Sequence, residues 1–293
     1  SLFANTTGTD NVAVGANSAD ANTTGSDNTA IGDNALGANT TASNNTAVGA
    51  DALLVNTTGT PNVAVGRGAL GANTTGGGNT AVGDIALGNN TTASSNTAVG
   101  RNCLNVNTTG AQNTAIGDSA LFRNTTADDN VAVGYYALDH NTTGANNTAV
   151  GSSALTANTT SPNNVAIGYG TLDAQTTGSG YNVAVGYNAL TANTSGTENT
   201  ASGWNALGAN TTGNYNTAFG GGSLDGNATG DYNTAIGWKA LTAVNTGDVN
   251  VGVGASALQA NTGGTQNTAV GGNAMYANTT GQDNVAVGHN ALD

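Results

Sequence analysis

The feature that most constrains the fold is a repeat of 17 residues that runs through the whole chain. Its consensus is Asn-(Thr/Val)-Ala-(Val/Ile)-Gly-x-x-Ala-Leu-x-x-Asn-Thr-Thr-Gly-x-x, numbered here as repeat positions 1 to 17. The register slips once, by one residue, near Tyr181. Self-similarity at a fixed period of this length is typical of stacked architectures in which each unit contacts mainly its neighbours. Because the pattern does not change along the chain, we expect a single elongated repeat domain over residues 1–293, without separate caps.

Each repeat predicts short extended pieces joined by turns. Positions 1 to 4 predict a strand in which the β-branched residues share one face and Ala takes the other. The Gly at position 5, for example Gly134, predicts a turn with positive φ. Leu at position 9 is the large core residue, replaced only in Ala19 and Met275, and we expect one Val and one Leu to be buried per coil. A helix between the two Asn positions is disfavoured relative to extended and turn structure, because this segment is short and closely bounded by Gly.

These features predict an all-β fold, a parallel β-solenoid of about 17 coils with 17 residues per coil. We expect two or three short strands in each coil, and one strand spacing between successive coils. Burial of so few apolar side chains per coil gives less free energy than ordering the backbone costs in entropy. Lateral association with other copies would therefore add stability. Either the Thr/Val column or the Ala column of the strand is a candidate for the packing face.

The Asn residues at positions 1 and 12 predict structural ladders. Position 12 is Asn in all units except two, which carry Gln175 and Val244. Stacked coils place these amides above one another, so that each donates a hydrogen bond to one neighbour and accepts one from the other. The ladder at position 1 includes Asn11, Asn28, Asn45, Asn62, Asn79, Asn96, Asn113, Asn130, Asn147, Asn164 and Asn182. A ligand-binding role is disfavoured because every coil carries these residues.

Composition excludes several classes of function. With 4 basic residues, 17 acidic residues and a net charge of −13, the chain cannot neutralise nucleic-acid phosphates. It also lacks an apolar run near 18 residues, so we expect no membrane insertion. Cys103 occupies an Ala position and is interpreted as a small buried residue, and no nucleophile–base pair is apparent. We therefore expect no enzyme activity, no catalytic residues, no cofactor and no metal site.

Position 6 varies and changes character along the chain. Its early members Arg67, Asp84, Arg101 and Asp118 alternate in sign, which predicts ion pairs between successive coils. Its later members are aromatic: Tyr135, Tyr169, Tyr187, Trp204 and Trp238. Two interpretations stay open, since exposed rings can stack on one another or contact a glycan or a partner. Acids before the strand, such as Asp231, are interpreted as solvated charge, because calcium needs several oxygens at one point.

The phrase Asn-Thr-Ala-Val-Gly-Ser-Ser-Ala-Leu-Thr-Ala-Asn-Thr-Thr, which begins at Asn147, resembles the repeats of phage tail-fibre and bacterial surface-fibre proteins. Its first half is also similar to the head repeats of trimeric autotransporter adhesins. The resemblance implies a β-roll, left-handed, with three chains side by side and with binding to host matrix or surface glycans. The period of 17 is longer than that of the adhesin heads, so the outer loop must be larger.

From these observations we expect a non-enzymatic structural fibre or adhesin segment, extracellular, on a cell surface or on a virion. Its main partner would be itself, in a lateral homo-oligomer such as a trimer or in a head-to-tail filament. The alternative is a module that binds ice through Thr columns or glycans through the aromatic column.

Overall fold

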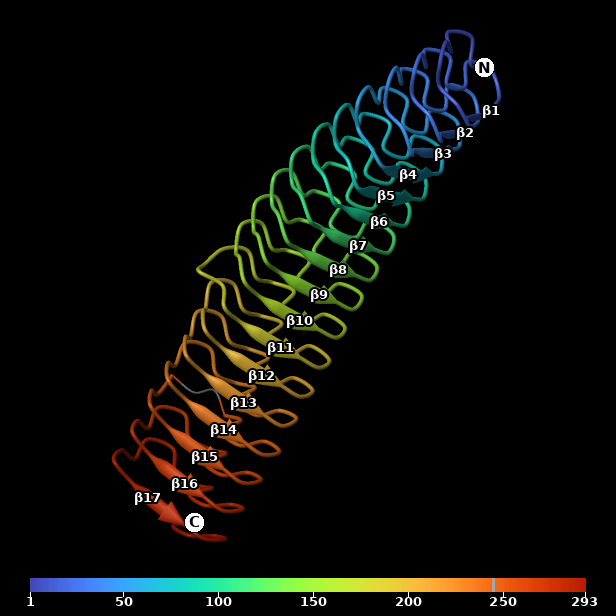
Figure 1. Ribbon diagram of the computed structural model, residues 1–293. Helices are drawn as coiled ribbons and strands as arrows, with labels where there is room; N and C mark the ends of the chain where they lie inside the picture. The colour runs from blue at the N-terminus through green and yellow to red at the C-terminus, as the bar shows by residue number, and fades with distance from the viewer. Residues whose placement is uncertain (244–245) are drawn as a thin grey trace. The chain divides into compact units, whose positions relative to one another are not determined.

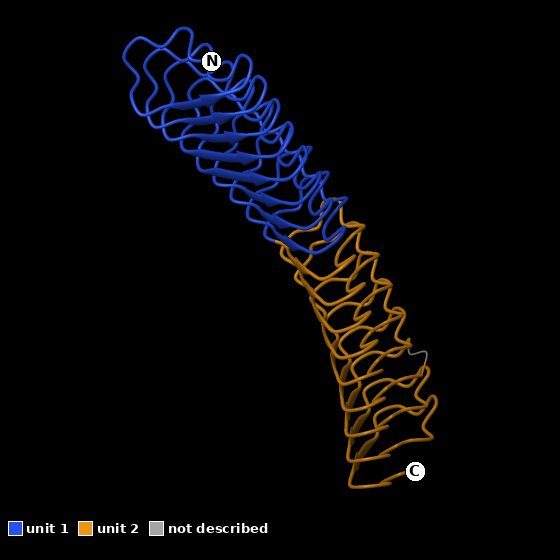
Figure 2. Cartoon of the chain, turned by 90° about the vertical axis from the view of Figure 1, so that its right-hand side faces the viewer, with its two compact units in different colours: residues 1–146 blue, residues 147–293 orange. Residues whose placement is uncertain are grey.

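The structure is a computed structural model that describes residues 1–243 and 246–293. Val244, one of the two departures at position 12, lies outside the described residues. Within the described residues the fold is all-β, with one short strand in each repeat and no helix (Figure 1). The chain divides into two units, residues 1–146 and residues 147–293 (Figure 2). Each unit is a parallel β-solenoid, as the repeat predicts.

The strands are three or four residues long and fall at repeat positions 1 to 4. Unit 1 contains β1 (Val12–Val14), β2 (Thr29–Ile31), β3 (Thr46–Val48), β4 (Asn62–Val65), β5 (Asn79–Val82), β6 (Thr97–Val99), β7 (Thr114–Ile116) and β8 (Val131–Val133). Unit 2 contains β9 (Thr148–Val150), β10 (Val165–Ile167), β11 (Val183–Val185), β12 (Thr200–Ser202), β13 (Thr217–Phe219), β14 (Thr234–Ile236), β15 (Val251–Val253), β16 (Thr268–Val270) and β17 (Val285–Val287).

Neighbouring strands pair so that equivalent repeat positions lie side by side. In β2 and β3, for example, Ala30 lies opposite Ala47. The one-residue slip of the sequence appears between β10 and β11, where Val165 pairs with Val183, 18 residues away. Hydrogen bonds between coils also run outside the strands, at positions 5, 7, 9 and 17 among others. Equivalent side chains therefore form columns along each unit.

The rest of each coil is built from turns, so the expectation of two or three strands per coil is wrong. Three positions per coil are left-handed, as in Asn34 (φ 55°), Leu36 (φ 54°) and Asn44 (φ 61°), and they interrupt any longer extended run. Gly32, at position 5, has a φ of 137°, and a Cβ there would lie 2.4 Å from the carbonyl oxygen of Gly49 in the next coil. Only glycine fits this position, because both the φ and the close backbone approach exclude a side chain.

The core of each coil is made of small residues around one leucine. Ala47, Ala52 and Leu53, at positions 3, 8 and 9, are fully buried, whereas Val and Ile at position 4 face outward. The expectation that Val is buried is therefore wrong. The reason is visible at Gly252, which replaces the strand Ala: a Cβ there would already contact Leu241 at 3.4 Å. A coil of 17 residues is too narrow for a larger inward side chain opposite Leu.

Two columns of buried Asn run beside this core and are joined through one backbone carbonyl per coil. The side-chain nitrogen of Asn39 donates to Asn22 Oδ1 (2.9 Å) and to the Ala42 carbonyl (3.0 Å). The same carbonyl accepts from Asn28 Nδ2 (2.9 Å), and Asn28 Oδ1 accepts from the backbone N–H of Asn45 (3.0 Å). The two amide columns thus satisfy polar groups that the narrow core would otherwise leave unpaired.

The departures at position 12 show how the column depends on the amide. Gln175, in the coil with the extra residue, continues the column on one side only. Its Oε1 accepts from Asn193 Nδ2, but its Nε2 donates to the Ser161 hydroxyl and the Thr177 carbonyl and not to Asn158 Oδ1 of the previous coil. Asn227 Oδ1 likewise receives no donor from the next coil: it is buried and has no hydrogen-bond partner among the described residues. The residue 17 positions later is Val244, which has no amide to donate.

Candidate functional site

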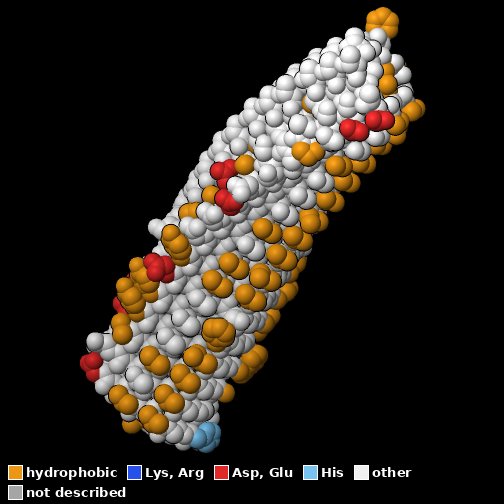
Figure 3. Space-filling model, viewed as in Figure 1, with side chains coloured by type: hydrophobic (Ala, Val, Ile, Leu, Met, Phe, Trp, Pro, Cys, Tyr) orange, Lys and Arg blue, Asp and Glu red, His pale blue; other side chains and the backbone are white. Residues whose placement is uncertain are grey.

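One continuous exposed surface of each unit is the outward face of its strands, formed by positions 2 and 4. Position 2 is Thr or Val and position 4 is mostly Val or Ile, so this face carries no charged side chain. Several of its apolar residues are exposed by more than a third, among them Val65, Ile116, Val185 and Ile236. Figure 3 shows rows of apolar side chains where these columns lie. We call this surface the outward strand face.

The outward strand face of each unit is an extended patch. Eight or nine strands spaced by about 4.8 Å, each about 10 Å long, give roughly 400 Å² per unit. This is about half of the roughly 800 Å² that each partner buries in a standard protein–protein interface. A continuous patch of this size on a protein surface is often a functional one.

The threonines of the Asn-Thr-Thr turns lie outside the strands. The hydroxyl of the first Thr donates to a backbone carbonyl of the next coil, as from Thr74 to Thr91 (2.9 Å) and from Thr108 to Thr125 (3.0 Å). The second Thr, such as Thr109, is exposed on the bend. These hydroxyls are held by the backbone or lie on a turn, so the geometry does not favour them as a flat array for binding ice.

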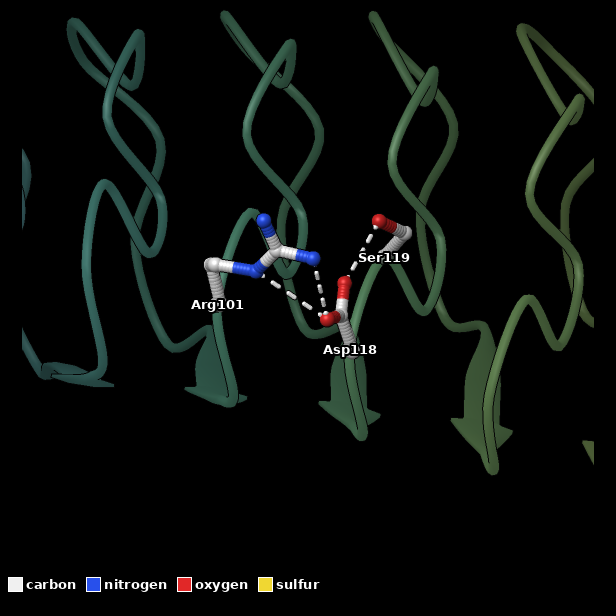
Figure 4. Close-up of polar contacts among 3 residues, drawn as sticks. All are labelled: Arg101, Asp118 and Ser119. Carbon is white, nitrogen blue, oxygen red and sulfur yellow. Dashed lines mark hydrogen bonds and ion pairs between the residues drawn. The ribbon is translucent and has the colours of Figure 1, made fainter.

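In unit 1 the charged part of the position 6 column forms two separate ion pairs. Arg67 lies 2.9 Å from Asp84, and Arg101 lies 2.7 Å from Asp118. Among the described residues no ion pair joins Asp84 to Arg101, so the expected continuous ladder is two pairs instead. Asp118 also accepts a hydrogen bond from Ser119 (2.9 Å), and the contacts with Arg101 and Ser119 lower its pKa (Figure 4). Both pairs are exposed to solvent, so each adds little to the stability of the fold.

The five aromatic residues that the sequence singled out at position 6 fall into three ring contacts. In unit 1, Tyr135 packs edge-to-face against its neighbour Tyr136, with centroids 4.2 Å apart. In unit 2, Tyr169 and Tyr187 lie in adjacent coils and stack at 5.4 Å. Stacking between coils therefore occupies part of the column, as one of the two interpretations expects.

Trp204 and Trp238 differ from the tyrosines because they lie two coils apart. Their rings are nearly parallel, with centroids 6.4 Å apart and an interplanar angle of 15°. The coil between them has Gly221 at position 6, and the ring of Trp238 lies over this glycine. Both indoles are about half exposed, at 51% and 54%. Sequence reasoning found the two tryptophans but missed the glycine that brings them together, although residues 220–222 spell three glycines in a row.

The acidic residues at position 16, just before the strands, cap the previous coil. Asp128 Oδ1 accepts from the backbone N–H of Ala111 (2.7 Å), and Asp248 Oδ1 accepts from that of Asp231 (2.8 Å). Among the described residues, no group of three or more His, Cys, Asp or Glu side chains could hold a metal ion. Their carboxylates thus satisfy backbone donors between coils.

Cys103 is fully buried, and its Sγ lies 3.0 Å from the carbonyl oxygen of Ala115. Burial raises the pKa of this thiol to about 12. A thiol in this environment stays protonated at neutral pH and is a poor nucleophile. The interpretation of Cys103 as a small core residue accords with this geometry.

Comparison with known proteins gives no relative from which a function could be transferred. No protein-family model matches the chain, and no curated protein matches it significantly. Across residues 1–243 and 246–293, the structure contains no helix of the length and apolarity needed to cross a membrane. The surfaces themselves are therefore the basis for a functional proposal.

Proposed function

We propose that this chain is a non-enzymatic structural fibre or adhesin segment that works outside the cell and associates laterally with copies of itself. The outward strand face carries this proposal. It consists mainly of Val, Ile and Thr, it has no charged side chain, and it extends along all the strands of each unit. A chain with a net charge of −13 repels its copies, so a surface free of charge is where two copies meet at the lowest electrostatic cost.

The lack of charge also distinguishes this face from the other sides of each coil. Acids and bases occupy positions 6, 7, 10, 11, 16 and 17, all outside the strand, and several of them pair with or cap neighbouring coils. Val, Ile and Thr at positions 2 and 4 instead present short, rigid side chains on a regular pleated surface. Such a surface packs against an equivalent surface without ordering long side chains, which keeps the entropic cost of association low.

The proposal is tested by the mass of the protein in solution. We expect multi-angle light scattering to give a mass that is a multiple of the 28.2 kDa of one chain. A double variant, Val65→Glu with Ile116→Glu, places buried charge in the interface and should return the mass to that of one chain. The matched control, Thr58→Glu with Thr109→Glu, adds the same charge on exposed turns and should leave the mass unchanged.

Circular dichroism of all three proteins verifies that the strands are retained. A wild-type protein that remains monomeric at high micromolar concentration rejects lateral self-association. Loss of association in both double variants would also reject it, because the effect would then follow from net charge and not from the outward strand face.

A further inference from the structure

Unit 2 contains one coil that lacks side chains where both neighbouring coils carry tryptophan. Gly221 and Gly222 occupy positions 6 and 7 of this coil, between Trp204 in the coil before and Trp238 in the coil after. The three coils are hydrogen-bonded at this point: Gly222 N donates to the Trp204 carbonyl (2.8 Å) and Lys239 N donates to that of Gly221 (3.0 Å). We call the two indoles with Gly221 and Gly222 the tryptophan slot.

The backbone of the tryptophan slot is spaced for one inserted ring. Two coil spacings place the backbones of Trp204 and Trp238 about 9.6 Å apart. The ring centroids of the two indoles lie 6.4 Å apart, closer together than the two backbones, and the Trp238 ring lies over the glycine. A ring held between them needs about 3.5–4.0 Å on each side, so an opening of about 1 Å beyond the observed 6.4 Å is enough. A small rotation of the half-exposed Trp238 side chain provides this opening.

The same three coils also carry polar side chains. The Asp225 carboxylate takes part in a hydrogen bond with the Asn205 side chain and is attracted by the Lys239 ammonium group. The Lys239 Nζ atom also lies 5.7 Å from the centroid of the Trp238 ring. The Lys239 ammonium group therefore lies beside one of the two aromatic rings, and the amide and the carboxylate belong to the same three coils. Aromatic rings with a few polar groups are the usual composition of a site for a ligand with apolar faces and a polar rim.

A pyranose ring has this combination of surfaces, with C–H groups on its faces and hydroxyl groups around its rim. We infer that the tryptophan slot binds a carbohydrate by inserting one pyranose ring between Trp204 and Trp238. Asn205, Asp225 and Lys239 supply the donors and acceptors for its hydroxyls. The tyrosine pair cannot do the same, because Tyr169 and Tyr187 lie in adjacent coils with no empty coil between them. This inference does not rest on lateral association.

The chain offers a direct readout, since its only two tryptophans are those of the slot. Intrinsic tryptophan fluorescence is measured while methyl glycosides of glucose, galactose, mannose and N-acetylglucosamine are added up to high millimolar concentrations. We expect a saturable change with at least one of them. Gly221→Ala should raise the dissociation constant at least tenfold, because a Cβ at this position lies 2.7 Å from Trp238 Cζ3 and forces this ring out of its place over the glycine, so that the two indoles no longer face each other.

Two further variants complete the test. Trp204→Ala removes one wall, leaves Trp238 as the reporter, and should also weaken binding at least tenfold. Tyr169→Ala removes a ring from the same column outside the slot and should change the dissociation constant less than twofold.

The inference is overturned if no sugar changes the fluorescence, or if binding survives both Gly221→Ala and Trp204→Ala. It is also overturned if the slot responds to N-acetylphenylalaninamide, which does not fluoresce with tryptophan, and to no sugar, since the occupant would then be an aromatic side chain. A protein that binds sugar but stays monomeric would refute the proposed self-association and leave the slot in place.

Discussion

Replacement of Asn107 by Ala tests whether the buried amide columns hold the coils together. The Asn107 side chain donates to Asn90 Oδ1 (3.0 Å) and to the Gly110 carbonyl (2.8 Å), and it accepts from Asn124 Nδ2 (2.8 Å). The variant leaves Asn90 Oδ1 without this donor and Asn124 Nδ2 with one acceptor fewer. The Gly110 carbonyl keeps its bond from Asn96.

The expected cost follows from these two groups. Asn90 Oδ1 becomes an unsatisfied buried group, which costs about 1–3 kcal/mol, whereas Asn124 Nδ2 keeps its bond to the Ala127 carbonyl and loses one hydrogen bond, which costs about 0.5–1.5 kcal/mol. Asn107→Ala should therefore lower the free energy of unfolding by about 1.5–4.5 kcal/mol. Urea unfolding followed by circular dichroism measures this change. The control Thr109→Ala removes an exposed side chain from the same turn and should stay within about 0.5 kcal/mol of wild type. An Asn107→Ala protein as stable as this control would show that the columns do not stabilise the fold.

Three further predictions concern titratable groups. Burial raises the pKa of Asp139, so its contribution to stability is greatest below the unfolded pKa of about 3.9 and is lost as pH rises through the folded value. Thermal melts between pH 4 and 7 should therefore show Asp139→Asn more stable than wild type at neutral pH, with the gain shrinking in acid; an equal gain at all pH values would contradict this. Cys103 should react with a thiol reagent only after unfolding, and rapid labelling of the native protein would show that its burial is wrong. Arg101→Ala should leave the urea-unfolding midpoint nearly unchanged, since its pair with Asp118 is exposed; a clear drop in the midpoint would contradict the exposed geometry.

The coil length and the position of the strand could be predicted because they follow from local chemistry. Gly32 and its equivalents mark the end of each strand, and the columns of Asn mark where polar groups must stack. The extra residue near Tyr181 was also visible, since it shifts every later repeat by one.

The inward face of the strand could not be predicted from alternation alone. The pattern of Thr, Ala and Val fixes which residues share a face, but not which face is buried. That choice depends on the width of the coil, which the left-handed Leu36 and Asn44 set by turning the chain sharply. Val48 is therefore outside and Ala47 inside, against the usual preference for burying the larger side chain.

The tryptophan slot was missed for a related reason. Trp204 and Trp238 are conspicuous in the sequence, but their pairing depends on a residue with no side chain, Gly221. A search of each column for positions without a side chain, as well as for conspicuous side chains, would have identified it.

The two ion pairs of unit 1 have a consequence for folding. A chain whose coils are nearly alike is prone to misalignment, in which one coil loops out and the next takes its place. Such an error of one coil would set Arg67 beside Arg101, or Asp84 beside Asp118, and so exchange attraction for repulsion. Alternating charge thus destabilises an arrangement in which the coils pair one repeat out of register, even though each ion pair adds little to the stability of the correct fold.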